Sequence, residues 1–66
     1  MSKESDLYKK VKDPYQEDED RLSAVDELGK MNTKDAKEYV YKLANDGYLK
    51  ETFRLRAYDY ATGQLK

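Results

Sequence analysis

Apolar residues in the first half of the chain recur at helical spacing behind a short acidic run. Leu22, Val25 and Leu28 follow one another at every third position and would lie on one face of a helix. The acidic run at residues 17–20 comes immediately before them, where negative charge stabilises the positive end of a helix dipole. This pattern predicts a helix over residues 17–30.

A second apolar stripe predicts a helix over residues 33–46. Asn32 or Thr33 can cap its N-terminus, because a side-chain oxygen there accepts a hydrogen bond from a free backbone N–H of the first turn. The apolar positions that follow at helical spacing are Ala36, Val40, Leu43 and Ala44. Gly47 is predicted to end this helix in the left-handed conformation.

The last segment, residues 48–66, carries two overlapping patterns. A strand is indicated by polar residues that alternate with Phe53, Leu55 and Ala57. A helix is indicated by the stripe formed by Leu49, Phe53, Ala57 and Tyr60. A hairpin turning at Thr62 and Gly63 would leave only three residues for its return strand. A third helix that stops near Gly63 is therefore favoured over a strand pairing with the N-terminal segment.

These elements predict a mostly α fold, in which residues 17–66 form a small helical domain: a helical hairpin covered by a third, C-terminal element. Residues 1–16 are expected to form a flexible or partner-ordered N-terminal arm, because Pro14 disfavours helical backbone at Asp13. The alternative is an α+β fold of winged-helix type. The predicted core consists of Leu22, Val25, Leu28, Ala36, Val40, Leu43, Leu49, Phe53 and Leu55.

The composition limits the stability that the chain can reach alone. A chain of 66 residues buries only about 60% of its unfolded surface. With no cysteine and no histidine, it has no disulfide or Cys/His metal cluster to reinforce it, which leaves a partner or homo-oligomerisation to cover further apolar surface. Absence of cysteine fits a reducing compartment, and no apolar stretch reaches the length of a membrane span. The expected location is the cytoplasm, with no membrane association.

Catalytic and cofactor chemistry lack their usual residues. Without histidine or cysteine there is no general base of the common kind, no thiol nucleophile and no typical zinc ligand set. The three glycines are isolated from one another, so they form no phosphate-binding loop. The acidic run lacks the ligand spacing and central glycine of a calcium loop. The chain is therefore expected not to be an enzyme and to bind no cofactor or metal.

Tyrosine and arginine indicate a contact surface. Seven tyrosines in so short a chain exceed what a thin core can bury, so at least two rings are expected at the surface. Tyr and Arg are the residues that most often supply binding energy at interfaces. The expected partner-binding residues are Tyr41, Arg54, Arg56, Tyr58 and Tyr60. The favoured function is a small adaptor, inhibitor or accessory subunit that binds a protein partner by occupying its surface.

The segment from Thr33 to Leu49 resembles the recognition helix and first wing strand of a winged-helix DNA-binding domain, in which a helix ending in Leu precedes a glycine turn and an apolar pair. This resemblance implies a DNA-binding regulator as the alternative function. The residues it assigns to the bases are Lys34, Lys37 and Tyr41, and those it assigns to phosphates are Arg54 and Arg56. The net charge of −1 is less basic than that of most nucleic-acid-coating proteins.

A shorter resemblance is to phycobilisome proteins. The run from Lys37 to Ala44, followed by Tyr48 and Phe53, is similar to the closing helix of phycobilisome linker domains. The residues whose spacing is similar to that of small phycobilisome-degradation proteins are Met31, Ala36, Lys42 and Leu43. Both resemblances imply a binding protein in a photosynthetic organism or its virus. Small charged chains without catalytic residues are also common among viral and mobile-element products, so a phage origin fits the composition.

Overall fold

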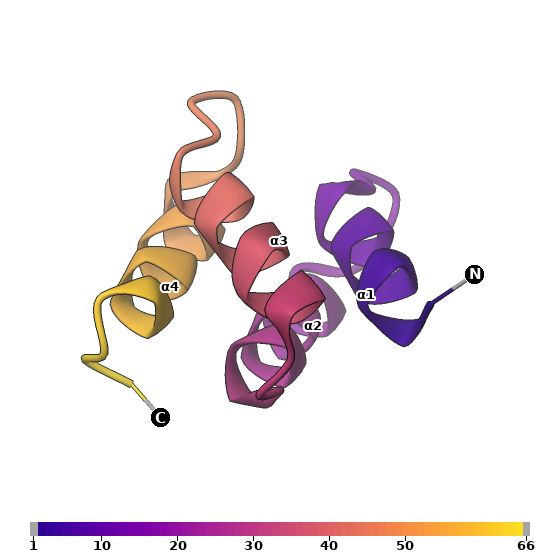
Figure 1. Ribbon diagram of the computed structural model, residues 1–66. Coiled ribbons are helices and arrows are strands. Elements are labelled where there is room, and N and C mark those ends of the chain that lie inside the picture. The colour runs from indigo at the N-terminus through magenta and orange to yellow at the C-terminus, as the bar shows by residue number, and fades with distance from the viewer. Residues whose placement is uncertain (1, 66) are drawn as a thin grey trace.

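The computed structural model describes residues 2–65 of the chain (Figure 1). Its helices are α1 (Lys3–Lys12), α2 (Asp18–Lys30), α3 (Lys34–Ala44) and α4 (Glu51–Ala61). The described residues contain no strand, so the prediction of a mostly α fold is confirmed and the α+β winged-helix alternative is not supported. The segment whose pattern fitted both a strand and a helix forms α4.

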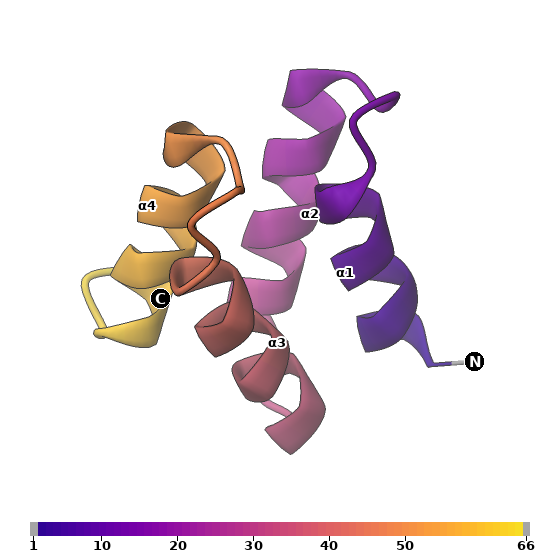
Figure 2. The ribbon, with the colours of Figure 1, turned by 90° about the horizontal axis from the view of Figure 1, so that it is seen from above.

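Helices α2 and α3 form the centre of the molecule. Figure 1 and Figure 2 both place α1 and α4 on opposite sides of this central pair. Helix α1 packs mainly against α2, whereas α4 packs against both α3 and α2. The body measures 27 × 26 × 18 Å, so every helix is close to the surface and has one face exposed.

Local hydrogen bonds determine where α3 begins and where α4 ends. The side-chain oxygen of Thr33 accepts a hydrogen bond from a backbone N–H of the first turn of α3 at 3.1 Å, so Thr33 is the cap. After α4, Gly63 has a φ of 81°, and the backbone N–H of Gln64 donates to the carbonyl of Asp59 at 2.8 Å. The prediction for Gly47 is wrong, because Gly63 is the only glycine with positive φ in residues 2–65.

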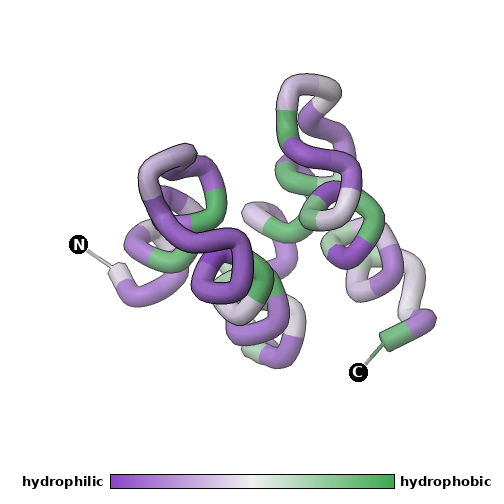
Figure 3. Tube along the Cα trace, turned by 180° about the vertical axis from the view of Figure 1, so that it is seen from behind, coloured by the Kyte–Doolittle hydropathy of each residue, from purple (hydrophilic) through white to green (hydrophobic). Residues whose placement is uncertain are grey.

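The core draws on one face of each helix. The buried apolar residues are Val11, Ala24, Val25, Leu28, Ala36, Val40, Leu43, Ala44, Leu49, Phe53 and Ala57. Figure 3 shows apolar and polar stretches alternating along the helices. The prediction that Leu55 belongs to the core is wrong, since its side chain is 45% exposed. Leu55 lies about 200° around α4 from the buried Phe53, because each helical residue advances by about 100°.

The expected N-terminal arm over residues 1–16 is, for the most part, a docked helix. Val11 of α1 is fully buried in the core. The ring of Tyr8 stacks on the ring of Tyr39 of α3, with the two centroids 4.7 Å apart. Pro14 marks the end of α1 and the loop to α2, so the proline that suggested an arm is a helix stop.

Arg21 of α2 connects the end of α1 to α4. Its Nε donates a hydrogen bond to the carbonyl oxygen of Val11 at 2.8 Å, which satisfies one of the carbonyls that the last turn of a helix leaves without a partner. Its guanidinium carbon lies 4.6 Å from the centroid of the Phe53 ring. One half-buried side chain therefore contacts two helices that lie on opposite sides of the molecule.

We predict that Val11→Ala lowers the free energy of unfolding by about 1.5–3 kcal/mol, because it removes two buried methyl groups and leaves a cavity beneath α1. Urea unfolding followed by far-UV circular dichroism measures this change. Lys10→Ala, on the exposed face of the same helix, is the matched control and should change stability by less than about 0.5 kcal/mol. Equal, negligible effects of both substitutions would mean that α1 does not dock.

Two ion pairs connect the loops at one end of the molecule. Lys12 of α1 pairs with Asp46 in the α3–α4 loop, and Lys50 in the same loop pairs with Asp18 of α2. The hydrogen bond from Lys12, followed by one from the backbone N–H of Tyr48, holds the pKa of the Asp46 carboxyl below its ordinary value. The bond to Asp46 raises the pKa of Lys12, and the bond from Lys50 lowers the pKa of Asp18.

These directions predict how stability depends on pH. Because the folded-state pKa of Asp46 is lowered, its contribution is present above the unfolded pKa of about 3.9 and is lost as the pH falls through the folded value. The pKa of Lys12 is raised, so its contribution is lost only as the pH rises through that raised value. Asp46→Asn should therefore destabilise the chain most near neutral pH, and the gap to the unsubstituted protein should close below about pH 4.

Thermal unfolding over a pH series measures this gap. Lys12→Ala provides the second arm of the experiment, because removing either partner eliminates the same interaction. The double substitution should then cost little more than either single one. A gap that stays constant from neutral to acidic pH would contradict the ion pair.

Candidate binding groove

A surface groove lies where the C-terminal ends of α2 and α4 meet α3. Its volume is about 530 Å³. The residues that line it are Leu28, Gly29, Lys30, Met31 and Asn32 from α2 and the link that follows, Lys37, Val40 and Tyr41 from α3, and Tyr60 and Ala61 from α4. The groove is thus built from three helices whose relative positions must be maintained for it to exist.

Apolar and aromatic side chains form most of the groove. Leu28 and Val40 also belong to the buried core, so the floor of the groove is continuous with the core. Tyr41 on α3 and Tyr60 on α4 supply aromatic surface; the Tyr41 side chain is 66% exposed, whereas Tyr60 is partly buried. An apolar concavity with a small number of polar groups is typical of a binding site.

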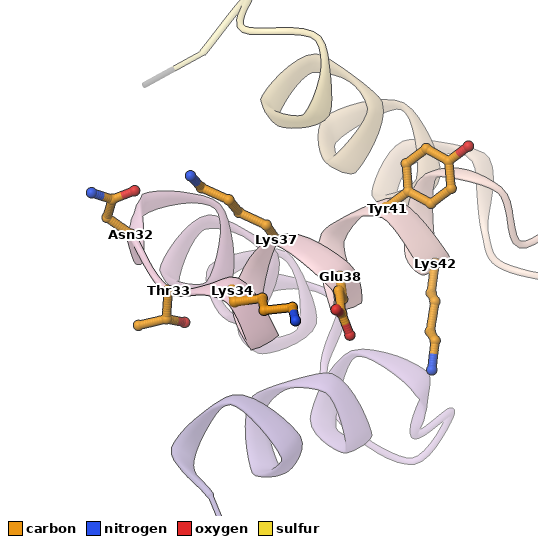
Figure 4. A pocket seen from close by; sticks show the side chains of 7 residues that line it. All are labelled: Asn32, Thr33, Lys34, Lys37, Glu38, Tyr41 and Lys42. Atoms are coloured by element: carbon orange, nitrogen blue, oxygen red, sulfur yellow. The ribbon is translucent and has the colours of Figure 1, made fainter.

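The charged residues of the groove are all basic. Lys30 and Lys37 line it, and no acidic residue does. Figure 4 shows the adjoining pocket on α3, which shares Lys37 and Tyr41 with the groove and is also lined by Glu38. In this view Lys37 and Tyr41 lie on the side of α3 that faces α4, whereas Lys42 points toward α1. Lys34 lies one turn before Lys37 in the exposed first turn of α3, near the positive end of the helix dipole. Within residues 2–65, Lys30, Lys34 and Lys37 take part in no ion pair, so their charge is available to a ligand.

Asp26 of α2 positions the wall that α4 contributes. Nη1 of Arg56 donates to both carboxylate oxygens of Asp26, at 2.9 and 3.1 Å. The hydroxyl of Tyr60 donates to one of the same oxygens at 2.8 Å. Burial, and next this hydrogen bond, raise the pKa of the Tyr60 hydroxyl above its ordinary value, so it is protonated and able to donate at neutral pH.

Gly29 allows the Tyr60 ring to approach α2. A Cβ atom added at Gly29 would overlap the Tyr60 ring at three of its carbon atoms, well inside contact distance. These ring carbons are close to the backbone of α4, so the ring cannot move aside as the tip of a long side chain would. The absence of a side chain at Gly29 is therefore what lets α4 pack closely on the last turn of α2.

The structure separates the five predicted partner-binding residues into three groups. Tyr41 and Tyr60 come together in the groove. Arg56 does not line the groove; it pairs with Asp26, which also holds Tyr60, and its side chain stays 37% exposed. Arg54 and Tyr58 do not line the groove; Tyr58 is 54% exposed elsewhere on α4, and Arg54 is half-buried.

Sequence reasoning missed Gly29, Lys30 and Met31 as parts of a site. Gly29 falls inside the helix predicted over residues 17–30, where a glycine is unfavourable unless packing requires it. The unfavourable helix propensity of this glycine was the signal in the sequence that another helix packs closely against it. Lys30 and Met31 carry no comparable signal, because their position in the groove depends on how α4 crosses α2.

Comparison with protein-family models, with curated proteins and with solved structures finds no match to this chain. Among residues 2–65 no three His, Cys, Asp or Glu side chains are grouped so that they could hold a metal ion. Within the same part of the chain, no helix has both the length and the apolar character needed to cross a membrane.

We predict that Gly29→Ala destabilises the protein by about 1–3 kcal/mol, because the added methyl group overpacks the contact with Tyr60. Helix propensity alone predicts the opposite sign, a gain of about 1 kcal/mol. Gly47→Ala, where an added Cβ meets nothing within 4 Å, is the matched control and should be close to neutral. Chemical unfolding measures both, and a stabilising Gly29→Ala would show that Tyr60 does not pack there.

Proposed function

We propose that this chain is a small non-catalytic protein-binding module, an adaptor, inhibitor or accessory subunit of the cytoplasm, whose groove takes an acidic amphipathic segment of a partner protein. The observation that carries the proposal is the groove between α2, α3 and α4, which combines aromatic walls with an entirely basic set of charges. The chain acts by occupying a surface of its partner and performs no reaction.

The apolar part of the groove favours a protein ligand. Its floor reaches the core at Leu28 and Val40, and Tyr41 presents a largely exposed ring beside it. Tyrosine anchors of this kind are enriched at protein interfaces, where a large rigid side chain buries area at a small cost in conformational entropy. A partner that inserts an apolar side chain here would remove this surface from water.

The charge of the groove favours an acidic segment. Lys30 and Lys37 line it, whereas Lys34 and Glu38 line the adjoining pocket on α3 and offset each other in charge. An incoming carboxylate would meet the ammonium groups of these two groove lysines. A basic segment would be repelled by the same groups, so charge determines which amphipathic segments bind.

Duplex DNA is the competing ligand, and two observations disfavour it. Arg56, which the winged-helix resemblance assigned to phosphates, is engaged by Asp26. The net charge of the chain is −1, and the exposed acidic residues 17–20 would add repulsion toward a polyanion. The lysines of the groove are therefore better matched to a few carboxylates than to a continuous phosphate backbone.

The test is fluorescence anisotropy of a labelled synthetic peptide with Leu and Tyr on one helical face and Glu on the other. We expect it to bind, with affinity reduced about tenfold by Lys37→Glu and about tenfold by Tyr41→Ala, the range typical of a central interface residue. The same peptide with Lys in place of Glu should bind far more weakly to the unsubstituted protein.

Matched controls lie outside the groove. Lys10→Glu on α1 makes the same charge change as Lys37→Glu, and Tyr58→Ala on α4 makes the same truncation as Tyr41→Ala. Both should leave peptide affinity within about twofold. Equal loss in groove and control variants would refute a specific site. Tight, salt-sensitive binding of a mixed-sequence duplex that is lost in Lys37→Glu would assign the lysines to nucleic acid instead.

A further inference from the structure

The chain itself carries a segment with the chemistry that the groove requires. Tyr15, at the tip of the α1–α2 loop, is 95% exposed. The residues that follow it, Glu17 to Asp20, are all exposed and lead into the first turn of α2. Among residues 2–65, only Asp18 of this run forms an ion pair. An exposed aromatic ring is thus followed, after Gln16, by an acidic run in which Glu17, Glu19 and Asp20 form no ion pair within the described chain.

This segment is complementary to the groove in charge and in its exposed aromatic ring. The groove offers an apolar floor beside Tyr41, and its charged residues, Lys30 and Lys37, are unpaired in the described chain. The segment offers one exposed ring and, within the next five residues, several free carboxylates. Opposite charge on two otherwise unpaired surfaces both steers and fixes an encounter between them.

The segment and the groove of one chain cannot meet. The segment lies at the N-terminal end of α2 and the groove at its C-terminal end. Helix α2 runs from Asp18 to Lys30 and separates them by about 18 Å at 1.5 Å per residue. A rigid helix keeps the two surfaces apart, so contact between them requires two molecules.

We propose that Tyr15 and the acidic first turn of α2 in one molecule occupy the groove of a second copy of this chain. This inference rests on the proposed function, because it identifies an occupant for the same groove. The contact is head-to-tail: each molecule presents one segment and one groove, so the association continues beyond a dimer unless it closes into a ring. At high concentration each molecule covers the groove of a neighbouring copy, and an acidic segment of a partner protein must displace that copy to bind.

Two variants with opposite defects provide the test. The segment variant combines Tyr15→Ala, Glu19→Gln and Asp20→Asn, and retains its groove. The groove variant combines Lys37→Glu and Tyr41→Ala, and retains its segment. All five positions are exposed, so both variants should fold, which circular dichroism and thermal unfolding verify. Sedimentation velocity over micromolar to millimolar concentrations then measures the average mass.

The unsubstituted chain should increase in average mass by about twofold or more over this range, and high salt should reverse the increase because the contact is between exposed charges. Each variant alone should remain a monomer. An equimolar mixture should form a dimer and nothing larger, because it contains one intact groove and one intact segment per pair. Tyr48→Ala is the matched control: Tyr48 is also fully exposed on a loop, its backbone N–H also bonds an Asp side chain two residues earlier, and no acidic run follows it. It should associate like the unsubstituted chain.

Three outcomes would overturn the inference. They are a monomer at millimolar concentration, association that survives in both variants, and a mixture of variants that stays monomeric. The failure of this inference is distinguishable from that of the proposed function. A groove that binds the acidic peptide while the chain remains a monomer removes the second copy as occupant and leaves the function intact, whereas a groove that binds neither the peptide nor the chain removes both.

Discussion

The contact of α4 with α2 through Asp26 is the interaction on which the groove depends. Asp26 accepts hydrogen bonds from Arg56 and from Tyr60, and both donors come from the last turns of α4. Gly29, one turn further along α2, leaves room for the Tyr60 ring. Because the carboxylate fixes the polar tip of Tyr60 and the glycine admits its ring, the C-terminal half of α4 has one position on α2. That position leaves α3 as the third side of the groove.

A thin molecule gains from long polar side chains that reach several helices at once. With only 18 Å along its shortest dimension, the body has a single layer of core, and no helix is surrounded by others. Arg21 contributes a hydrogen bond to the end of α1 and a cation–π contact to Phe53, while its own charge stays partly hydrated. The ion pairs of Lys12 and Lys50 bring the loops together at the end remote from the groove. Such contacts specify which helix packs where, even though exposed pairs add little free energy each.

Local signals predicted the helices, and tertiary contacts decided what local signals left open. Periodicity and the cap at Thr33 placed α2 and α3 within two residues of their observed ends. Helix α1 was not predicted, because its apolar residues Leu7, Tyr8 and Val11 form only a short stripe ahead of Pro14 and because Tyr39, on which Tyr8 stacks, is distant in sequence. The groove escaped prediction for the same reason, since its walls come from three helices. Only Gly29, a glycine within a helix, indicated from the local sequence that another element packs closely there.

The charges that distinguish the two ends of α2 are also those that stabilise it. Acidic residues occupy its first turn and Lys30 its last, which is the arrangement that the helix dipole favours at each end. Binding sites often keep groups that oppose folding, such as buried charges without partners or strained backbone. Neither is present among residues 2–65, where no buried polar side-chain atom lacks a hydrogen-bond partner and no non-glycine residue has positive φ. The separation of charge along α2 therefore involves no strained backbone and no unpaired buried group in this part of the chain, and a chain this small can keep an acidic end and a basic groove while remaining folded.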